Sequence, residues 1–212
     1  IDENAFKGKS LEIIQSIKKN KIVLKKDLKS ISPSALKALL DKKILIEIKK
    51  EVYRLDEKYD RKDSCITLTD KQKNVVDKVL KKKDGFMPFL LHGVTGSGKT
   101  EVYINIVEKI VSDGKEAIIL VPEISLTPQV ISKFKSKFGD IVAVLHSGLS
   151  DGEKYDEWRK IVRKEVSIVI GARSAIFAPF ENIGVIIIDE EHSDTYKQEN
   201  TPRYNAIDMA LY

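Results

Sequence analysis

Residues 93–100 have the types and spacing best suited to chemistry, reading Gly-Val-Thr-Gly-Ser-Gly-Lys-Thr. They complete the pattern G-x-x-x-x-G-K-[ST], in which glycine lets the backbone approach an anion closely and lysine reaches the outer phosphates of a nucleotide. The hydroxyl of Thr100 is of the kind that holds Mg²⁺ beside those phosphates. We therefore predict a site for ATP and Mg²⁺, and its expected contacts from this segment are Gly93, Thr95, Gly96, Ser97, Gly98, Lys99, Thr100 and Glu101.

The sequence on either side of the loop favours this interpretation over a chance glycine turn. The apolar run at residues 86–91 predicts a strand at 89–91, and residues 100–111 predict a helix. A strand that enters a glycine-rich turn and leaves as a helix aims backbone N–H groups and a helix N-terminus at phosphate. The context is therefore that of a phosphate-binding loop.

An acidic cluster further along the chain can supply the other half of such a site. Residues 183–188 predict a strand, and its continuous β-branched run at 185–188 is typical of a central strand of a parallel sheet covered on both faces. Asp189-Glu190-Glu191-His192 follows directly. An acidic cluster at a strand end can be only a solvated loop. However, open α/β sheets bind ligands at the carboxyl ends of their strands, so we expect Asp189 to meet the Mg²⁺ held by Thr100. Glu190 is placed to polarise an attacking water, and Lys99, Asp189 and Glu190 are the predicted catalytic residues.

The composition describes a chain that can bury a core, because 42% of its 212 residues are hydrophobic and 33% are charged. No run approaches the roughly twenty apolar residues of a membrane span. No signal peptide opens the chain, so we expect a cytoplasmic protein without a membrane partner. The single cysteine, Cys65, excludes an internal disulfide within these residues. Because the chain opens at Ile1 and stops in a helical stretch at Tyr212, we interpret it as an excised fragment.

A net charge of +5 permits binding to nucleic acid without requiring it. A change of character along the chain predicts three segments. They are a small domain at 1–58, a charged linker at 59–66 and a larger domain at 67–212.

The first segment resembles a winged helix. Ser32 and Pro33 look like the cap and first-turn proline of a helix, and alternating apolar residues at 44–48 and 52–55 predict a β-hairpin after it. In winged helices the third helix often docks on DNA, and here that helix would be residues 34–42. A role as a protein-contact module or spacer fits the same pattern, and both interpretations stay open.

Beyond the linker, strands and helices alternate. The predicted strands are 89–91, 117–121, 141–145, 167–170 and 183–188, and the predicted helices are 100–111, 127–138 and 151–163. This alternation predicts an α/β fold with a mostly parallel sheet and helices on both faces, as in a RecA-like P-loop NTPase lobe.

Five further strings resemble the motif series of superfamily 2 helicases, and among them the primosomal replication-restart helicases. They are Leu-Thr-Asp-Lys-Gln at 68–72, Leu-Val-Pro-Glu-Ile-Ser-Leu-Thr-Pro-Gln at 120–129, Leu-His-Ser-Gly-Leu at 145–149, Gly-Ala-Arg-Ser-Ala-Ile-Phe-Ala-Pro-Phe at 171–180 and the acidic box at 189–192. The resemblance covers nearly the whole chain. It implies that residues 67–212 are the first, ATP-binding helicase lobe, truncated before a second lobe.

The resemblance also implies roles for individual residues. Gln72 would hydrogen-bond the adenine base, and His192 would couple the nucleotide site to DNA. The segment at 194–204 resembles an aromatic-rich loop that couples DNA binding to hydrolysis, where aromatic faces stack on bases and cations meet phosphate. The implied DNA contacts are Pro122, Glu123, Arg173, Ser174, Tyr196, Lys197, Arg203 and Tyr204. Trp158 is outside this set, because its helical spacing with Tyr155 and Ile161 favours packing in a core or interface.

By the same resemblance, the whole protein would be an ATP-dependent DNA helicase that translocates 3′ to 5′ on single strands, unwinds DNA at stalled forks and promotes primosome assembly. The implied partners are single-stranded and forked DNA, single-strand-binding protein and helicase-loading proteins, and zinc is expected only in a part outside this chain. We expect the fragment to be monomeric, with little hydrolysis and no unwinding, because it lacks the arginine that a second lobe supplies.

Two other classes of protein compete with this interpretation. A P-loop translocase or remodeller acting on duplex DNA or on protein would share the phosphate loop and the acidic box, but not the aromatic-rich loop or the winged helix. A binding module that has lost catalysis would be expected to carry a damaged Lys99, Thr100, Asp189 or Glu190, and all four are present.

Overall fold

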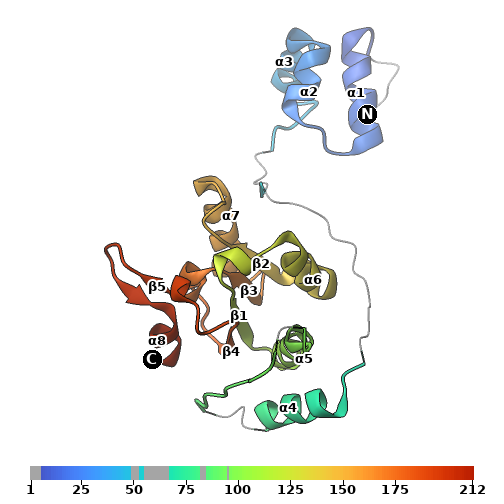
Figure 1. Cartoon of the computed structure of the whole chain (residues 1–212). Helices are drawn as coiled ribbons and strands as arrows, with labels where there is room; N and C mark the ends of the chain where they lie inside the picture. Colours follow the sequence, from blue (N-terminus) through green and yellow to red (C-terminus); the bar gives the residue numbers. More distant parts are fainter. Residues whose placement is uncertain (1–5, 49–52, 55–66, 82–84, 95) are drawn as a thin grey trace. The chain divides into compact units, whose positions relative to one another are not determined.

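The structure is a computed structural model that describes residues 6–48, 53–54, 67–81, 85–94 and 96–212 (Figure 1). The chain forms two compact units, residues 1–51 and 52–212. The predicted linker at 59–66 and Cys65 lie outside the described residues. The predicted segment boundaries therefore stay predictions.

The first unit contains three helices, α1 (Lys9–Asn20), α2 (Lys25–Ile31) and α3 (Pro33–Asp41). As predicted, Ser32 caps α3: its hydroxyl accepts a hydrogen bond from the backbone N–H of Ala35 at 3.3 Å, and proline occupies the first turn. The three helices share one apolar cluster. Its buried members are Ile13, Ile14, Leu28, Leu36 and Leu39. These helices fit the helical part of a winged helix, and that assignment stays a prediction.

The first strand predicted for the hairpin of that winged helix is not formed. Residues 44–48 lie in a bend and irregular chain. Ile44 packs against the three helices, but Ile46 is 83% and Ile48 is 76% exposed. Alternating apolar residues form a strand when they have a paired neighbour and a covered face, and Ile46 and Ile48 lack the covered face. Most of the second predicted segment, 52–55, lies outside the described residues.

The second unit is organised around a sheet of four parallel strands (Figure 1). In chain order they are β1 (Glu116–Leu120), β2 (Val142–Leu145), β3 (Ile168–Gly171) and β4 (Ile183–Ile188). In space their order is β2-β3-β1-β4. This order brings the carboxyl ends of β1 and β4 together, because Leu120 is in register with Ile188.

Helices cover both faces of this sheet, which confirms the predicted α/β class. In β1, Ala117 and Ile119 face α5 (Lys99–Ser112) and α6 (Pro128–Phe138), whereas Ile118 and Leu120 face the opposite side. That side is covered by α7 (Asp151–Val162), the 3-10 turn η4 (Arg173–Phe177) and α8 (Ala206–Leu211). Helix α4 (Asp70–Leu80) packs on α5. No helix within the described ranges is long and apolar enough to cross a membrane.

The strand predicted at 89–91 is wrong. Residues 86–92 are irregular, and Phe86 is 69% and Leu90 79% exposed, while only Leu91 packs against the core. Within the described residues, β4 has a partner on one side only, so it forms an edge of the sheet and not the central strand that its β-branched run predicts. A strand is completed by a ladder of hydrogen bonds to a neighbour, which an apolar run alone does not supply.

Two residues from the amino-terminal side of the second unit, Tyr53 and Arg54, lie against α7. The carboxylate of Asp156, which is 1% exposed, accepts hydrogen bonds from the backbone N–H of Arg54 at 3.0 Å and from its guanidinium at 2.8 Å. Arg159 donates a third bond to Asp156 at 3.1 Å, and its guanidinium lies 5.0 Å from the centroid of the Tyr53 ring. Asp156 therefore anchors this segment to the helix.

These donors, first the backbone N–H of Arg54, hold the pKa of the Asp156 carboxyl below its ordinary value. A pKa that is lower in the folded state stabilises the fold at neutral pH, and the gain is lost as the pH falls through that lowered pKa. We expect Asp156→Asn to be less stable than the unchanged protein at pH ~7, with a difference that shrinks below pH ~4. Urea unfolding across this range would show it. A constant difference would contradict the assignment, and Asp140→Asn, at an exposed residue, is the control.

Candidate nucleotide site and nucleic-acid surface

The phosphate loop adopts the left-handed backbone that its glycines allow. Gly96 and Gly98 both have φ +80°, and Gly98 is the N-cap of α5. A side chain at Gly98 would be strained by this φ, and its Cβ would lie 2.5 Å from the Gln72 amide nitrogen. The left-handed turn therefore requires glycine here, and any side chain would also displace the Gln72 amide from the loop.

Gln72 joins α4 to this loop. Its side-chain oxygen accepts a hydrogen bond from the backbone N–H of Thr69 at 2.9 Å in a capping box, and its amide nitrogen donates to the backbone oxygen of Ser97 at 3.2 Å. The side chain thus positions the phosphate loop. The adenine contact implied for Gln72 remains a prediction.

The ammonium of Lys99 lies within the loop that precedes it. It donates to the backbone oxygens of Gly93 at 2.7 Å and Val94 at 3.2 Å. Thr100 is half-buried in the first turn of α5, and Glu101 forms an ion pair with Lys133 of α6. Thr95 lies outside the described residues. An ammonium, a hydroxyl and the backbone N–H groups of a helix N-terminus suit a nucleotide phosphate.

Asp189 follows β4 and is held against the helix that the phosphate loop begins. Its carboxylate accepts hydrogen bonds from the Tyr103 hydroxyl at 3.1 Å and from the backbone N–H of Glu190 at 3.2 Å. Burial, then the neighbouring Asp189 charge, raises the pKa of the Tyr103 hydroxyl far above its ordinary value, so this group stays protonated and donates. Tyr103 had no sequence signal as a site residue, because it reads as one of the apolar positions of α5.

Glu190 occupies an unusual turn. Its φ of +48° is in the left-handed region, which costs a non-glycine residue roughly 1 kcal/mol. The turn brings its carboxylate to the hydroxyl of Ser125, which donates at 3.3 Å from the 3-10 turn η2 (Glu123–Ser125). Lys99 and Thr100 at the start of α5, and Asp189 and Glu190 after β4, therefore belong to elements in direct contact. Carboxylate and hydroxyl oxygens are the ligands that Mg²⁺ prefers, so these residues fit a magnesium–nucleotide complex.

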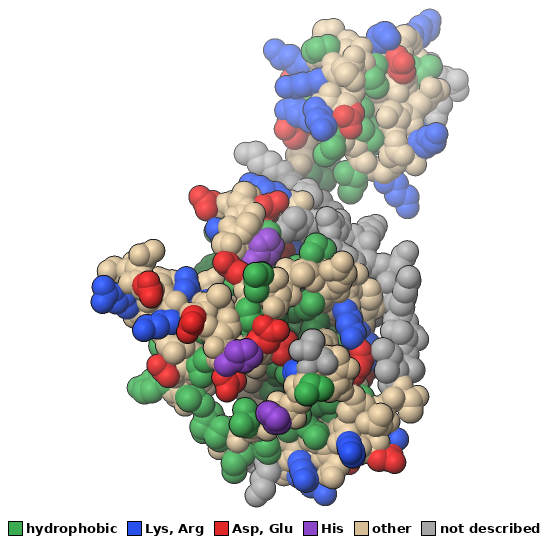
Figure 2. All heavy atoms as spheres, viewed as in Figure 1, with side chains coloured by type: hydrophobic (Ala, Val, Ile, Leu, Met, Phe, Trp, Pro, Cys, Tyr) green, Lys and Arg blue, Asp and Glu red, His purple; other side chains and the backbone are tan. Residues whose placement is uncertain are grey.

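A second set of predicted residues meets around Arg173. Its guanidinium donates to the backbone oxygens of Lys197 at 2.6 Å and Thr195 at 3.3 Å, and it lies 5.9 Å from the centroid of the Tyr204 ring. Lys197 and Tyr204 belong to a short hairpin, β5 (Lys197–Gln198) and β6 (Tyr204–Asn205). The structure therefore joins two of the strings for which DNA contacts were predicted. In Figure 2, Lys and Arg side chains lie on this hairpin at the edge of the second unit.

Arg203 lies between the two hairpin strands and donates to the backbone oxygen of Glu199 at 2.9 Å. Ser174 is next to Arg173 on η4, and Glu123 is exposed on η2. His192 is exposed beside the acidic turn. The binding and coupling roles predicted for these residues stay predictions.

The structure does not support base stacking by Tyr196. This residue, in η5 (Asp194–Tyr196), is 1% exposed, and its hydroxyl donates to the backbone oxygens of Asp189 at 2.5 Å and Leu120 at 3.1 Å. Burial, and then the charge of Asp189, raises the pKa of this hydroxyl. Tyr196 therefore ties the ends of β1 and β4 together. Pro122 is also buried, so its side chain is not available to DNA.

Trp158 also differs from the expectation. Of the two expected environments, the core is wrong, because Trp158 is 47% exposed on α7 and Tyr155 one turn earlier is 59% exposed. The buried face of the helix carries Glu157 and Ile161 instead. Packing in an interface stays a prediction.

Comparison of the sequence and the fold with known proteins identifies the family of this chain. The sequence profile described as "DEAD/DEAH box helicase" matches residues 69–210, so the chain belongs to the DEAD/DEAH box helicase family. Two of the most similar relatives share one protein name within this family. Replication restart protein PriA of Bacillus subtilis (strain 168) is 56% identical over 184 residues, and that of Synechocystis sp. is 52% identical over 144.

The match covers 85% and 68% of this chain, but only 23% and 17% of these two relatives. The chain therefore spans less than a quarter of their length. The UvsW helicase from bacteriophage T4 has a similar fold, with a TM-score of 0.50 at 16% identity, covering 84% of this chain and 64% of that one. The predicted RecA-like fold and the resemblance to replication-restart helicases are confirmed.

Proposed function

We propose that this chain is the ATP-binding first lobe of a replication-restart helicase that couples ATP hydrolysis to 3′-to-5′ movement on single-stranded DNA and unwinds stalled forks. The observation that carries the proposal is the hydrogen bond of 3.1 Å between Tyr103 and Asp189. It joins the helix headed by the phosphate loop to the carboxylate after β4. These are the two halves that a nucleotide–magnesium site needs.

In this site Lys99 and the N-terminus of α5 would hold the phosphates, and Thr100 and Asp189 would hold Mg²⁺. Bound Mg·ATP would supply the phosphoanhydride bond, and neutralisation of the charge that develops on the transferred phosphoryl group would lower the barrier to its cleavage. Glu190 would orient and polarise water, with its carboxylate steadied by Ser125. Gln72 would contact adenine as well as support the loop. His192 would communicate between this site and DNA.

The surface around Arg173 would bind single-stranded DNA. Arginine and lysine meet phosphate while the Tyr204 ring offers a face to a base, which is a sequence-tolerant mode of binding. The proposed contacts are Glu123, Arg173, Ser174, Lys197, Arg203 and Tyr204. The three-helix unit would be a winged helix that binds DNA or a protein partner. The relatives' name, replication restart protein, supports restart of replication as the process. The proposed partners are single-strand-binding protein and helicase loaders, and the proposed location is the cytoplasm.

The role of Asp189 is tested by nucleotide binding, because hydrolysis is expected to need a second lobe. Calorimetric titration of ATP with Mg²⁺ and with EDTA should show tighter binding with the metal. Asp189→Asn keeps an oxygen that can accept from Tyr103 and Glu190 but removes the charge. We expect it to lose about tenfold or more of the magnesium-dependent gain. Binding that does not depend on Mg²⁺, or a variant that retains the full gain, would contradict the proposal.

The matched control for this experiment is Asp140→Asn. Asp140 is exposed and precedes β2, at the amino end of the strands, whereas Asp189 follows β4 at their carboxyl end. The control removes the same charge at the opposite end of the strands from the proposed metal site. Its magnesium dependence should equal that of the unchanged chain.

A further inference from the structure

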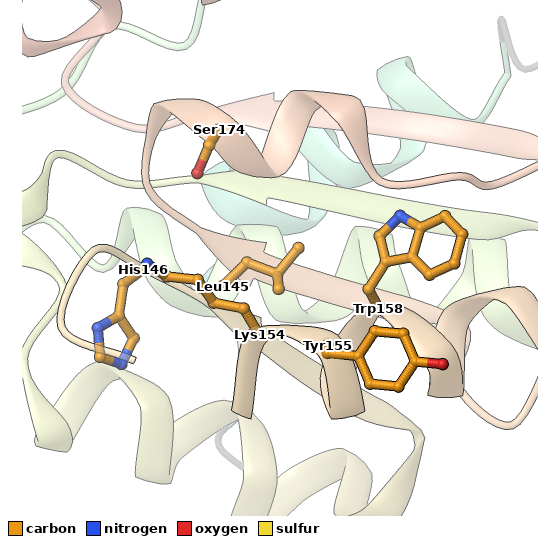
Figure 3. A pocket seen from close by; sticks show the side chains of 6 residues that line it. All are labelled: Leu145, His146, Lys154, Tyr155, Trp158 and Ser174. Carbon is orange, nitrogen blue, oxygen red and sulfur yellow. The ribbon is translucent and has the colours of Figure 1, made fainter. Parts of the chain in front are cut away.

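A pocket of about 310 Å³ lies beside the proposed DNA surface, at the carboxyl ends of β2 and β3 (Figure 3). Leu145 ends β2, His146 follows it, Ser174 lies in the turn after β3, and α7 forms the remaining wall. The six lining residues are Leu145, His146, Lys154, Tyr155, Trp158 and Ser174. None of them belongs to the phosphate loop or the acidic turn, so the pocket is distinct from the nucleotide site.

Two exposed aromatic residues border this pocket. Tyr155 and Trp158 are spaced three residues apart on α7, and they are 59% and 47% exposed. Indole and phenol rings are usually buried because their apolar faces are costly to hydrate. Figure 3 shows both rings on the same side of the pocket, with His146 at the far side. The wall therefore offers an aromatic platform, made of these two rings, without a covering element in the described structure.

The helix that carries this platform is held firmly. Ser150 and Glu153 form a capping box at the start of α7. The buried carboxylate of Glu157, adjacent to Trp158 in sequence, accepts a hydrogen bond from the backbone N–H of Val144 in β2 at 2.9 Å. Arg159 lies 5.4 Å from the centroid of the Tyr155 ring. A platform on a fixed helix loses little conformational freedom when a ligand stacks on it.

Several polar groups that line the pocket can donate hydrogen bonds, and no acceptor within the described residues receives them. In the part of the chain that the structure describes, the Lys154 ammonium, the Trp158 indole N–H and the Ser174 hydroxyl have no hydrogen-bond partner. The backbone N–H of Gly148 donates to Nδ1 of His146 at 3.2 Å, so the proton of the neutral ring lies on Nε2 and adds another donor. Ammonium and indole groups only donate, and the pocket therefore suits an acceptor-rich, anionic ligand with an aromatic face.

We propose that this pocket binds a base of single-stranded DNA, stacked on Trp158, with the Lys154 ammonium on a neighbouring phosphate. The inference rests on the proposed function and adds a base-binding subsite to it. Continuity favours DNA over a protein occupant, because Ser174 of the pocket adjoins Arg173 of the proposed DNA surface. Aromatic stacking with a nearby cation is the usual way in which proteins hold single strands without reading their sequence.

Fluorescence gives a direct test, because Trp158 is the single tryptophan of the chain. A base stacked on the indole should quench its emission. We expect quenching when a short oligothymidylate is titrated into the 212-residue chain. An abasic oligomer of the same length has the phosphates but no bases, and it should bind without quenching. Unchanged emission at saturating oligothymidylate would overturn the proposal.

Variants measured by anisotropy with a fluorescein-labelled oligothymidylate separate this inference from the proposed function. Trp158→Ala should weaken binding by about fivefold or more, and Trp158→Phe by less. Val162→Ala is the matched control, since Val162 lies one turn further along α7, is also 47% exposed and does not line the pocket. It should bind like the unchanged chain.

Three outcomes are informative. Weaker binding by both Trp158→Ala and Arg173→Ala supports the subsite. Weaker binding by Arg173→Ala alone overturns the subsite and leaves the proposed function standing. An unchanged chain that binds no single-stranded DNA overturns both, and a protein ligand would then be the remaining occupant of the pocket.

Discussion

The Lys99→Ala variant is expected to bind Mg·ATP about 10- to 100-fold more weakly than the unchanged chain, with no loss of secondary structure. The side chain donates charge-assisted hydrogen bonds, which are typically worth about 1.5–3 kcal/mol each. Its ammonium now donates to the backbone oxygens of Gly93 and Val94, both within the phosphate loop. These bonds place the ammonium where it can exchange the backbone oxygens for phosphate oxygens of a bound nucleotide. The variant therefore loses the hydrogen bonds from Lys99 to the phosphates.

The fold should tolerate this change. The Lys99 side chain contributes no atoms to the apolar clusters, and alanine is the best helix former at the first residue of α5. Far-ultraviolet circular dichroism should therefore be unchanged, and calorimetric titration of Mg·ATP and Mg·ADP would measure the loss. Lys109→Ala is the matched control, because Lys109 is an exposed lysine in the last turn of the same helix. Equal affinities of the Lys99→Ala and Lys109→Ala variants would refute the assignment of residues 93–100.

Much of the second unit could be predicted, because β1 and β3 are buried on both faces. The bounds predicted for the strand at 183–188 match the observed β4, Ile183–Ile188, although it is an edge strand, and the motif residues after it lie beside α5 as expected. Continuous apolar runs report burial directly. The cap at Ser32 could also be predicted from the sequence. A serine before proline accepts a hydrogen bond from a backbone N–H in the first turn of its own helix, and this bond needs no distant residue.

The failures involve contacts between segments that are distant in the sequence. Residues 89–91 have a strand-like composition, but a strand also needs a neighbour with which to form a ladder. Tyr196 was predicted to be a surface aromatic, yet its hydroxyl has two backbone acceptors at the ends of β1 and β4. These hydrogen bonds offset the cost of removing the hydroxyl from water, so the side chain can be buried. Core packing of Trp158 was the reverse error, because Glu157 rather than the indole occupies the inward side of α7.

The second large effect is expected from Glu157→Ala, which should destabilise the second unit by about 3 kcal/mol. Glu157 is 1% exposed, and its two oxygens accept from the backbone N–H of Val144 at 2.9 Å and from the ammonium of Lys160 at 2.6 Å. Among the described residues β2 pairs with β3 alone and so is an edge strand, and Glu157 satisfies a backbone donor that the sheet leaves open. Alanine would leave this donor buried without an acceptor, which costs about 1–3 kcal/mol, and would unpair Lys160 as well.

Urea unfolding followed by tryptophan fluorescence suits this measurement, since Trp158 adjoins Glu157 and reports on the second unit alone. Glu157→Gln retains an oxygen that can accept from Val144 but loses the ion pair, so its loss should be nearer 1 kcal/mol. Glu191→Ala removes an exposed carboxylate and should change stability by less than about 0.5 kcal/mol. Similar stabilities for the Glu157→Ala and Glu191→Ala variants would mean that Val144 finds another acceptor. The edge of the sheet would then be closed by something other than Glu157.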